Sequence, residues 1–214
     1  GGVNVACGDL DGDGRAEVVV GPEAGRAPDV KVFAVGPLSA VLTTQFQAYE
    51  PAFTGGVRVS ATRFAGSGVV GAFNIATTPG PGRAVDVRMW LAGGGSAAQV
   101  FSAGLMASTT GARVVLGDVD GDSSLDLVVT SDSGTPWVLR AYALSTGALV
   151  LDATAGAGGY RSVTAAVGVF AGGPGRPELL AGSGPGETPT VATYIVGSGS
   201  VVGPRVRVAA AEVP

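Results

Sequence analysis

The stretches GDLDGDGRAEVVVG (Gly8–Gly21) and GDVDGDSSLDLVVT (Gly117–Thr130) each place four acidic side chains within nine residues, directly before or within an apolar run. Counted from the first aspartate, the acidic residues occupy positions 1, 3, 5 and 9 of both stretches. Carboxylates that are this crowded repel one another, so the pattern favours a cation held between them. The same spacing occurs twice, which indicates that the chain contains internal repeats.

Four copies of one plan follow each other along the chain. Each predicts a short strand, an acidic or glycine-rich loop, an apolar strand that ends in a Gly/Pro turn, and two further strands. The copies span residues 1–54, 55–110, 111–161 and 162–214. The expected third strands are Asp29–Val35, Val85–Leu91, Trp137–Leu144 and Thr190–Val196. The expected fourth strands are Ala40–Tyr49, Ala97–Ser102, Ala148–Ala155 and Val201–Val213.

Valine alternation of the V-x-V type, cut by turns from 37 glycines, predicts an all-β protein. Four antiparallel strands in each repeat of about this length are typical of a propeller blade. We therefore expect a β-propeller-type fold with four repeats of about four antiparallel strands each. The apolar first and second strands are expected to pack on both faces, and the more polar fourth strand to form an outer edge. The alternative is a β-sandwich whose self-similarity is coincidental.

The alternate spacing of the aspartates allows positions 1, 3 and 5 of a coiled loop to converge on one centre, with the carbonyl of position 7 closing the ring. Position 7 is Arg15 in the first loop and Ser124 in the second. Six or more oxygen ligands of this kind suit Ca²⁺. An EF-hand is excluded, because position 12 is a valine in both loops and the flanking segments are strands. The alternative is a pair of solvated turns, since Asp and Gly favour turns.

The D-x-D-x-D-G-x-x-[DE] loop, followed by an apolar strand and a turn such as VGPEAG or AGSGPG, resembles the FG-GAP (VCBS) repeat. That family includes the calcium-binding blades of integrin α-subunit propellers and repeats of bacterial secreted proteins. The resemblance implies two bound Ca²⁺ ions. It implies as ligands Asp9, Asp11, Asp13, the Arg15 carbonyl and Glu17, and likewise Asp118, Asp120, Asp122, the Ser124 carbonyl and Asp126.

This sequence departs from the family pattern at several places. Ser123 stands where the loop usually has glycine, which predicts a small strain in a left-handed turn. Glu17 is longer than the aspartate usual at its position. The second and fourth repeats lack the acidic set, retaining Arg63 and Glu178 at the aligned positions. The guanidinium of Arg63 stands either where an ion would be or free in solvent.

Composition limits the function classes. The chain has no histidine, so Ser–His–Asp, Cys–His and the usual zinc sites are absent, and we expect that it is not an enzyme. The 12 arginines and the single lysine, Lys31, are dispersed, which argues against nucleic-acid binding, and no apolar run predicts membrane insertion. Eight of the 17 acidic residues lie in the two loops, and two Ca²⁺ would bring the formal charge of −4 to about zero.

We expect a non-catalytic, calcium-binding module, secreted or at the cell surface, that serves protein interaction, adhesion or surface and filament structure. A protein partner or self-association is expected. The alternative is a lectin that binds carbohydrate between blades. Such a site needs exposed aromatic rings. Trp137 is either exposed at the rim of a blade or buried, and Trp90 is expected in the core. Four blades either close alone or belong to a larger ring, array or filament.

Two further expectations concern the beginning of the chain. The chain starts at GGVNV with neither an initiator methionine nor a signal peptide, which we interpret as a processed product or a fragment. The single cysteine, Cys7, lies in an apolar strand and is expected in the core as an inert residue.

Overall fold

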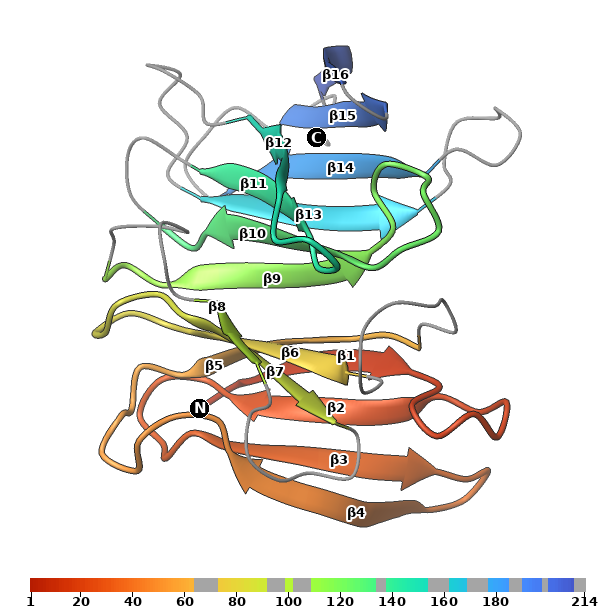
Figure 1. Ribbon diagram of the computed structural model, residues 1–214. Coiled ribbons are helices and arrows are strands. Elements are labelled where there is room, and N and C mark those ends of the chain that lie inside the picture. The colour runs from red at the N-terminus through yellow and green to blue at the C-terminus, as the bar shows by residue number, and fades with distance from the viewer. Residues whose placement is uncertain are drawn as a thin grey trace. The chain divides into compact units, whose positions relative to one another are not determined.

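The computed structural model is an all-β protein. Within the residues that it describes, all regular structure is β-strand, arranged in four antiparallel sheets of four strands each (Figure 1). The described residues are 1–63, 73–91, 99–101, 109–133, 138–153, 162–168, 177–184, 190–197 and 200–209. The all-β expectation is confirmed.

Within each sheet the strands lie in chain order, so that neighbours along the chain are hydrogen-bonded neighbours. The first sheet consists of β1 (Val3–Gly8), β2 (Glu17–Pro22), β3 (Asp29–Val35) and β4 (Ala40–Gln47). The second consists of β5 (Val57–Ala61), β6 (Phe73–Pro79), β7 (Val87–Leu91) and β8 (Gln99–Phe101). The third consists of β9 (Ala112–Gly117), β10 (Asp126–Ser131), β11 (Leu139–Ala143) and β12 (Leu149–Asp152). The fourth consists of β13 (Val163–Gly168), β14 (Glu178–Ser183), β15 (Thr190–Gly197) and β16 (Ser200–Ala209).

The chain divides into two compact units, Gly1–Val114 and Val115–Pro214. Each unit has its own hydrophobic core, built from the inward faces of its strands. The core of the first unit includes Val19, Val30, Val32, Val57, Ile75 and Trp90. The core of the second includes Val128, Leu139, Leu151, Val163, Leu179 and Tyr194. The alternating valines of the sequence therefore supply the core in both units.

Trp90 lies in the core, as expected. It is 4% exposed, stacks on Phe46 with ring centroids 4.3 Å apart, and donates its indole N–H to the Thr77 hydroxyl at 3.0 Å. A ring held in this way is not available to stack on a sugar. Trp137, the other tryptophan considered for such a role, lies outside the described residues.

The expected third strand of the second repeat begins two residues later than predicted, at Val87. The reason is a polar cluster: the Asp86 carboxylate binds the guanidinium groups of Arg83 and Arg88. Both guanidinium groups also lie over the Tyr49 ring, with Cζ atoms 4.4 and 4.6 Å from its centroid. Tyr49, expected at the end of the fourth strand, instead follows β4 as a buried residue.

The expectation that the first strand packs on both faces is wrong for β1. Val3 and Val5 are 56% and 59% exposed, and Cys7 on the same face is exposed, so the prediction of a core cysteine is also wrong. Strand β1 is the edge of its sheet and alternates exposed with half-buried residues, because only its other face meets β5. In contrast, the second strand of the third repeat, β10, is buried along its whole length.

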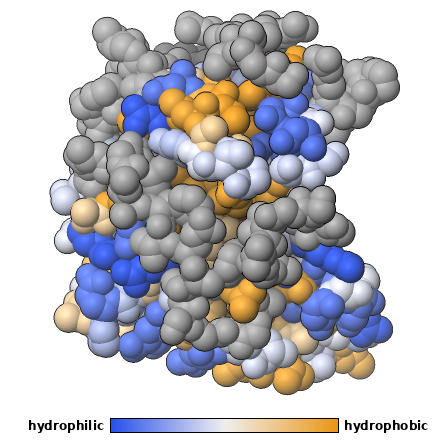
Figure 2. Space-filling model, viewed as in Figure 1, coloured by the Kyte–Doolittle hydropathy of each residue, from blue (hydrophilic) through white to orange (hydrophobic). Residues whose placement is uncertain are grey.

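The expectation of a polar outer edge is confirmed only in part. Strand β4 is mostly exposed, and Lys31 on the adjacent β3 is exposed as expected. However, β4 and the turn before it also expose Leu38, Val41 and Leu42, and hydrophobic atoms are visible at this edge of the surface (Figure 2).

Consecutive sheets within a unit are joined by a recurring polar contact. The carbonyl oxygen of the residue that opens β5, Val57, accepts a hydrogen bond from the Asn4 side chain at 2.9 Å. In the second unit, the corresponding carbonyl of Val163 in β13 accepts the Thr130 hydroxyl at 2.8 Å. The starts of the second and fourth sheets are therefore each fixed to a buried or half-buried side chain of the preceding sheet in the same unit.

Candidate metal centres

The first acidic loop connects β1 to β2 and is folded around the carboxylate of Asp9. The amides of Gly12 and Gly14 donate to the two oxygens of this carboxylate, at 2.7 Å and 3.2 Å. Both glycines have positive φ, 88° and 86°, which brings their N–H groups inward without the cost that a side chain would add. The first aspartate therefore sets the path of the whole loop.

The other two aspartates of this loop are held by the backbone that follows them. Asp11 accepts the amide of Asp13 at 3.1 Å, and Asp13 accepts the amide of Arg15 at 2.8 Å. As a result, Asp9, Asp11 and Asp13 each offer an oxygen within 4.8 Å of the other two. The alternate spacing thus produces the convergence that it predicts.

The second loop, between β9 and β10, repeats these contacts one by one. Asp118, Asp120 and Asp122 converge within the same 4.8 Å limit. The matching hydrogen bonds are Gly121 N to Asp118 Oδ1 (2.7 Å), Ser123 N to Asp118 Oδ2 (3.0 Å), Asp122 N to Asp120 Oδ1 (3.1 Å) and Ser124 N to Asp122 Oδ1 (2.6 Å). Two segments more than 100 residues apart have therefore taken the same loop conformation.

The acidic residues at position 9, Glu17 and Asp126, lie outside the three-aspartate clusters, and each accepts a hydrogen bond from a backbone amide of its loop. Glu17 Oε2 accepts the amide of Leu10 at 2.7 Å, and Asp126 Oδ2 accepts the amide of Val119 at 2.8 Å. Glutamate and aspartate make the same contact here, so the extra methylene of Glu17 leaves the pattern unchanged. The two residues are 6% and 0% exposed. Each opens the second strand of its sheet.

Asp126 has an unusual environment. Its second oxygen, Oδ1, is buried and has no hydrogen-bond partner. Burial raises the pKa of Asp126 to about 7, and the negative charges of Asp120, Asp122 and Asp118 add to the shift. A buried carboxylate without a donor is costly unless a proton or a cation neutralises it.

The electrostatics of the two clusters differ. Burial and the neighbouring charges of Asp122 and Asp118 raise the pKa of Asp120, despite the amide bond that it accepts. For Asp9 burial acts in the same upward direction, but the amides of Gly12 and Gly14 and the guanidinium of Arg63 outweigh it and lower the pKa. Among the described residues, a cationic side chain contacts the first cluster, where Arg63 binds Asp9, but none contacts the second.

These residues fit a hard divalent cation. Every converging side-chain donor is a carboxylate oxygen, with no nitrogen or sulfur in either cluster. Oxygen-only donor sets are those that Ca²⁺ and Mg²⁺ prefer. In the second loop the buried, unpartnered Asp126 Oδ1 is a further carboxylate oxygen, which lies outside the three-aspartate cluster.

Sequence reasoning missed two contacts with the first loop: it did not consider Asn74, and it considered Arg63 only for the loop of its own repeat. The Asn74 side chain, in β6, donates to the Leu10 carbonyl at 2.7 Å and is buried. Arg63 donates to Asp9 Oδ2 at 2.9 Å. Both come from the second repeat, more than 50 residues away, so no local pattern predicts the contacts. The loops of the second and fourth repeats themselves fall largely outside the described residues.

Ser123 adopts the left-handed conformation that its position predicts, with φ of 63°, and it is the single non-glycine residue with positive φ in the described part of the chain. A side chain in this region costs on the order of 1 kcal/mol. We therefore expect Ser123→Gly to raise the free energy of unfolding by about 0.5 to 1 kcal/mol in urea titrations. Ser124→Gly, one residue on and without positive φ, is the control and is expected to lower it slightly. Equal effects of the two substitutions would contradict the assignment of strain to Ser123.

Comparison with known proteins adds no family assignment: no protein-family model matches the chain, and no curated protein matches it significantly. Within the described residues, no helix has the length and apolar character needed to cross a bilayer.

Proposed function

We propose that the chain is a non-catalytic repeat module that binds two Ca²⁺ ions, one in each acidic loop. The observation that carries this proposal is the matched geometry of the loops, in which the same four amide-to-carboxylate bonds bring three aspartates together twice. A cation between the aspartates would offset the repulsion of the three like charges that each loop brings together. The unpartnered Asp126 Oδ1 supports a cation in the second loop.

Ca²⁺ is proposed over Mg²⁺ because of the donor geometry available. Flexible loops with carboxylate and carbonyl donors suit the irregular, six- to eight-fold coordination of Ca²⁺, whereas Mg²⁺ requires a near-ideal octahedron. Asp9, Asp11 and Asp13 would hold the first ion, together with the Arg15 carbonyl and Glu17. The second would take Asp118, Asp120, Asp122, the Ser124 carbonyl and Asp126.

The resemblance to FG-GAP (VCBS) repeats extends the proposal to architecture. The first and second sheets are joined by the Asn4 side chain on the Val57 carbonyl, and the third and fourth by the Thr130 hydroxyl on the Val163 carbonyl. Both contacts are consistent with neighbouring blades of a β-propeller-type fold. We propose that the module acts outside the cell, secreted or at the cell surface, where millimolar Ca²⁺ can fill weak sites. Its role there is binding to protein partners or to other copies of itself.

Calorimetric titration with CaCl₂ tests the metal sites. We expect two sites with dissociation constants of roughly 10⁻⁴ to 10⁻³ M, and a much weaker response to MgCl₂. Asp11→Ala and Asp120→Ala are each expected to remove one site, and the double variant both. Glu23→Ala, an exposed acidic residue outside the loops, is the matched control and should retain both sites.

Stability measurements give a second readout. At millimolar Ca²⁺, mass action predicts a gain of on the order of 0.4 to 1.4 kcal/mol per occupied site. Chelator should remove the gain in the wild type and have no effect on the double variant. Heats that are unchanged in both single variants would remove the basis of the proposal.

A further inference from the structure

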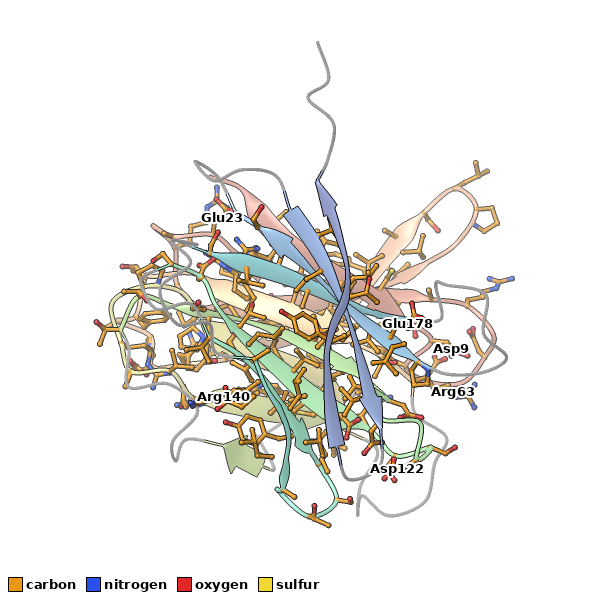
Figure 3. The ribbon with its side chains drawn as sticks, turned by 90° about the horizontal axis from the view of Figure 1, so that it is seen from above. Asp9, Glu23, Arg63, Asp122, Arg140 and Glu178 are labelled. Carbon is orange, nitrogen blue, oxygen red and sulfur yellow. The ribbon has the colours of Figure 1, made fainter. Side chains whose placement is uncertain are left out.

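The guanidinium of Arg63 lies directly on the first acidic loop (Figure 3). Arg63 follows β5 by two residues, and its Nη1 donates to Asp9 Oδ2 at 2.9 Å. Its Nη2 is so near the backbone of Gly12 that a Cβ there would be 2.8 Å away. The guanidinium therefore covers both the first aspartate and the turn that follows it.

The contacted oxygen is one that the loop already uses. Asp9 Oδ2 also accepts the amide of Gly14, so the guanidinium completes a set of donors around the first aspartate. The side chain of Arg63 is 50% exposed. Ion pairs of this exposure add little to global stability, so the consequence of the contact is expected to be local.

A positive charge at this place competes with a metal ion. A divalent cation in the first loop would be coordinated by Asp9. The guanidinium of Arg63 already partly neutralises the charge of this carboxylate. Two cations a few ångströms apart repel each other, and the repulsion is screened by solvent and salt but not abolished.

We propose that Arg63 is a built-in counter-cation of the first loop, which holds the loop in its folded shape without metal and weakens its affinity for Ca²⁺. The inference rests on the proposed function. It gives an arginine in the degenerate loop of the second repeat a role in the metal site of the first repeat.

A different role for Arg63 makes the opposite prediction. If the guanidinium only positions the Asp9 carboxylate for the ion, removing it weakens Ca²⁺ binding. The sign of the change in affinity therefore decides between competition and positioning.

The test uses the full chain with one site removed at a time. In the Asp120→Ala background, in which only the first loop binds, we expect Arg63→Gln to tighten the Ca²⁺ dissociation constant by about three- to tenfold, with a smaller gain at higher salt. Arg63→Lys, which keeps the charge, should leave the affinity close to that of Arg63. In the Asp11→Ala background, in which only the second loop binds, Arg63→Gln should have no effect.

Hydrogen exchange of the metal-free protein gives an independent readout. Arg63→Gln should speed exchange of the Gly12 and Gly14 amides, and leave the Gly121 and Ser123 amides unchanged. An unchanged or weakened affinity in the Asp120→Ala background would overturn the inference while the proposed function stands. Absence of binding in both single-site backgrounds would instead overturn the proposed function and the competition with it.

Discussion

In metal-free protein, Asp126→Asn is expected to raise the free energy of unfolding at pH 8 and to leave it nearly unchanged at pH 4. The carboxylate is completely buried, its Oδ1 has no partner, and three aspartates lie close enough to repel it. Asparagine keeps an oxygen for the Val119 amide and replaces the unpartnered oxygen by an uncharged donor. The substitution thus removes the cost of the buried charge and retains the contact that shapes the loop.

The pH window follows from the pKa. The pKa of Asp126 rises from 3.8 to about 7 on folding, so the folded state holds its proton more strongly than the unfolded state does. The stabilisation from this proton is complete below pH 3.8 and is lost as pH rises through about 7. A shift of about three units corresponds to at most about 4 kcal/mol, and sharing of the proton with the neighbouring carboxylates makes about 2 to 4 kcal/mol the expected range.

Urea titrations between pH 4 and pH 8, on protein stripped of metal over a chelating resin, measure this effect. The difference in the free energy of unfolding between wild type and Asp126→Asn at each pH gives the contribution of Asp126, separate from that of the other acidic residues. Glu17→Gln is the matched control, since Glu17 makes the same amide contact in the first loop and no buried oxygen of it lacks a partner. A difference between wild type and Asp126→Asn that stays constant across the pH range would contradict the prediction.

The acidic loops were predictable because their geometry is local. Asp9 and Asp118 bind amides three and five residues ahead, and the next two aspartates bind amides two residues ahead. Such contacts depend on spacing and on residues that tolerate positive φ, both of which the sequence displays. The alternation of valines similarly predicts the strands, and the expected third strands of the first and fourth repeats agree with β3 and β15 to within one residue.

The remaining features depend on contacts between distant segments. The exposure of Cys7 depends on which face of β1 the next sheet covers. V-x-V alternation does not reveal this, because it also fits a strand covered on both faces. The contact of Arg63 with Asp9 depends on how the second repeat packs against the first. Asn74, which binds the Leu10 carbonyl, has no sequence signal at all within its own repeat.

The same packing of repeats makes Gly21→Ala a strongly destabilising substitution. Gly21 lies in β2, facing β5 of the next sheet, and a Cβ at this position would lie 2.6 Å from the Val57 carbonyl oxygen and 2.9 Å from a Val59 methyl. Because the nearest atom belongs to the backbone, no side-chain rotation relieves the overlap, and the two sheets must separate. We expect a loss of about 2 to 3 kcal/mol in the free energy of unfolding, as for other overpacked interiors.

Gly36→Ala is the control for this prediction. It lies in the turn between β3 and β4, where the nearest atom to an added Cβ is the Ser39 hydroxyl oxygen at an ordinary 3.4 Å. Since alanine reduces the freedom of the unfolded chain, we expect Gly36→Ala to be neutral or to stabilise by up to about 1 kcal/mol. Opposite signs for the two substitutions in urea titrations, at fixed Ca²⁺, would show that the first two sheets are packed in contact at Gly21. If Gly21→Ala were tolerated as well as Gly36→Ala, the close approach of β2 to β5 would be wrong, and the proposed β-propeller-type fold would lose the support of this packing.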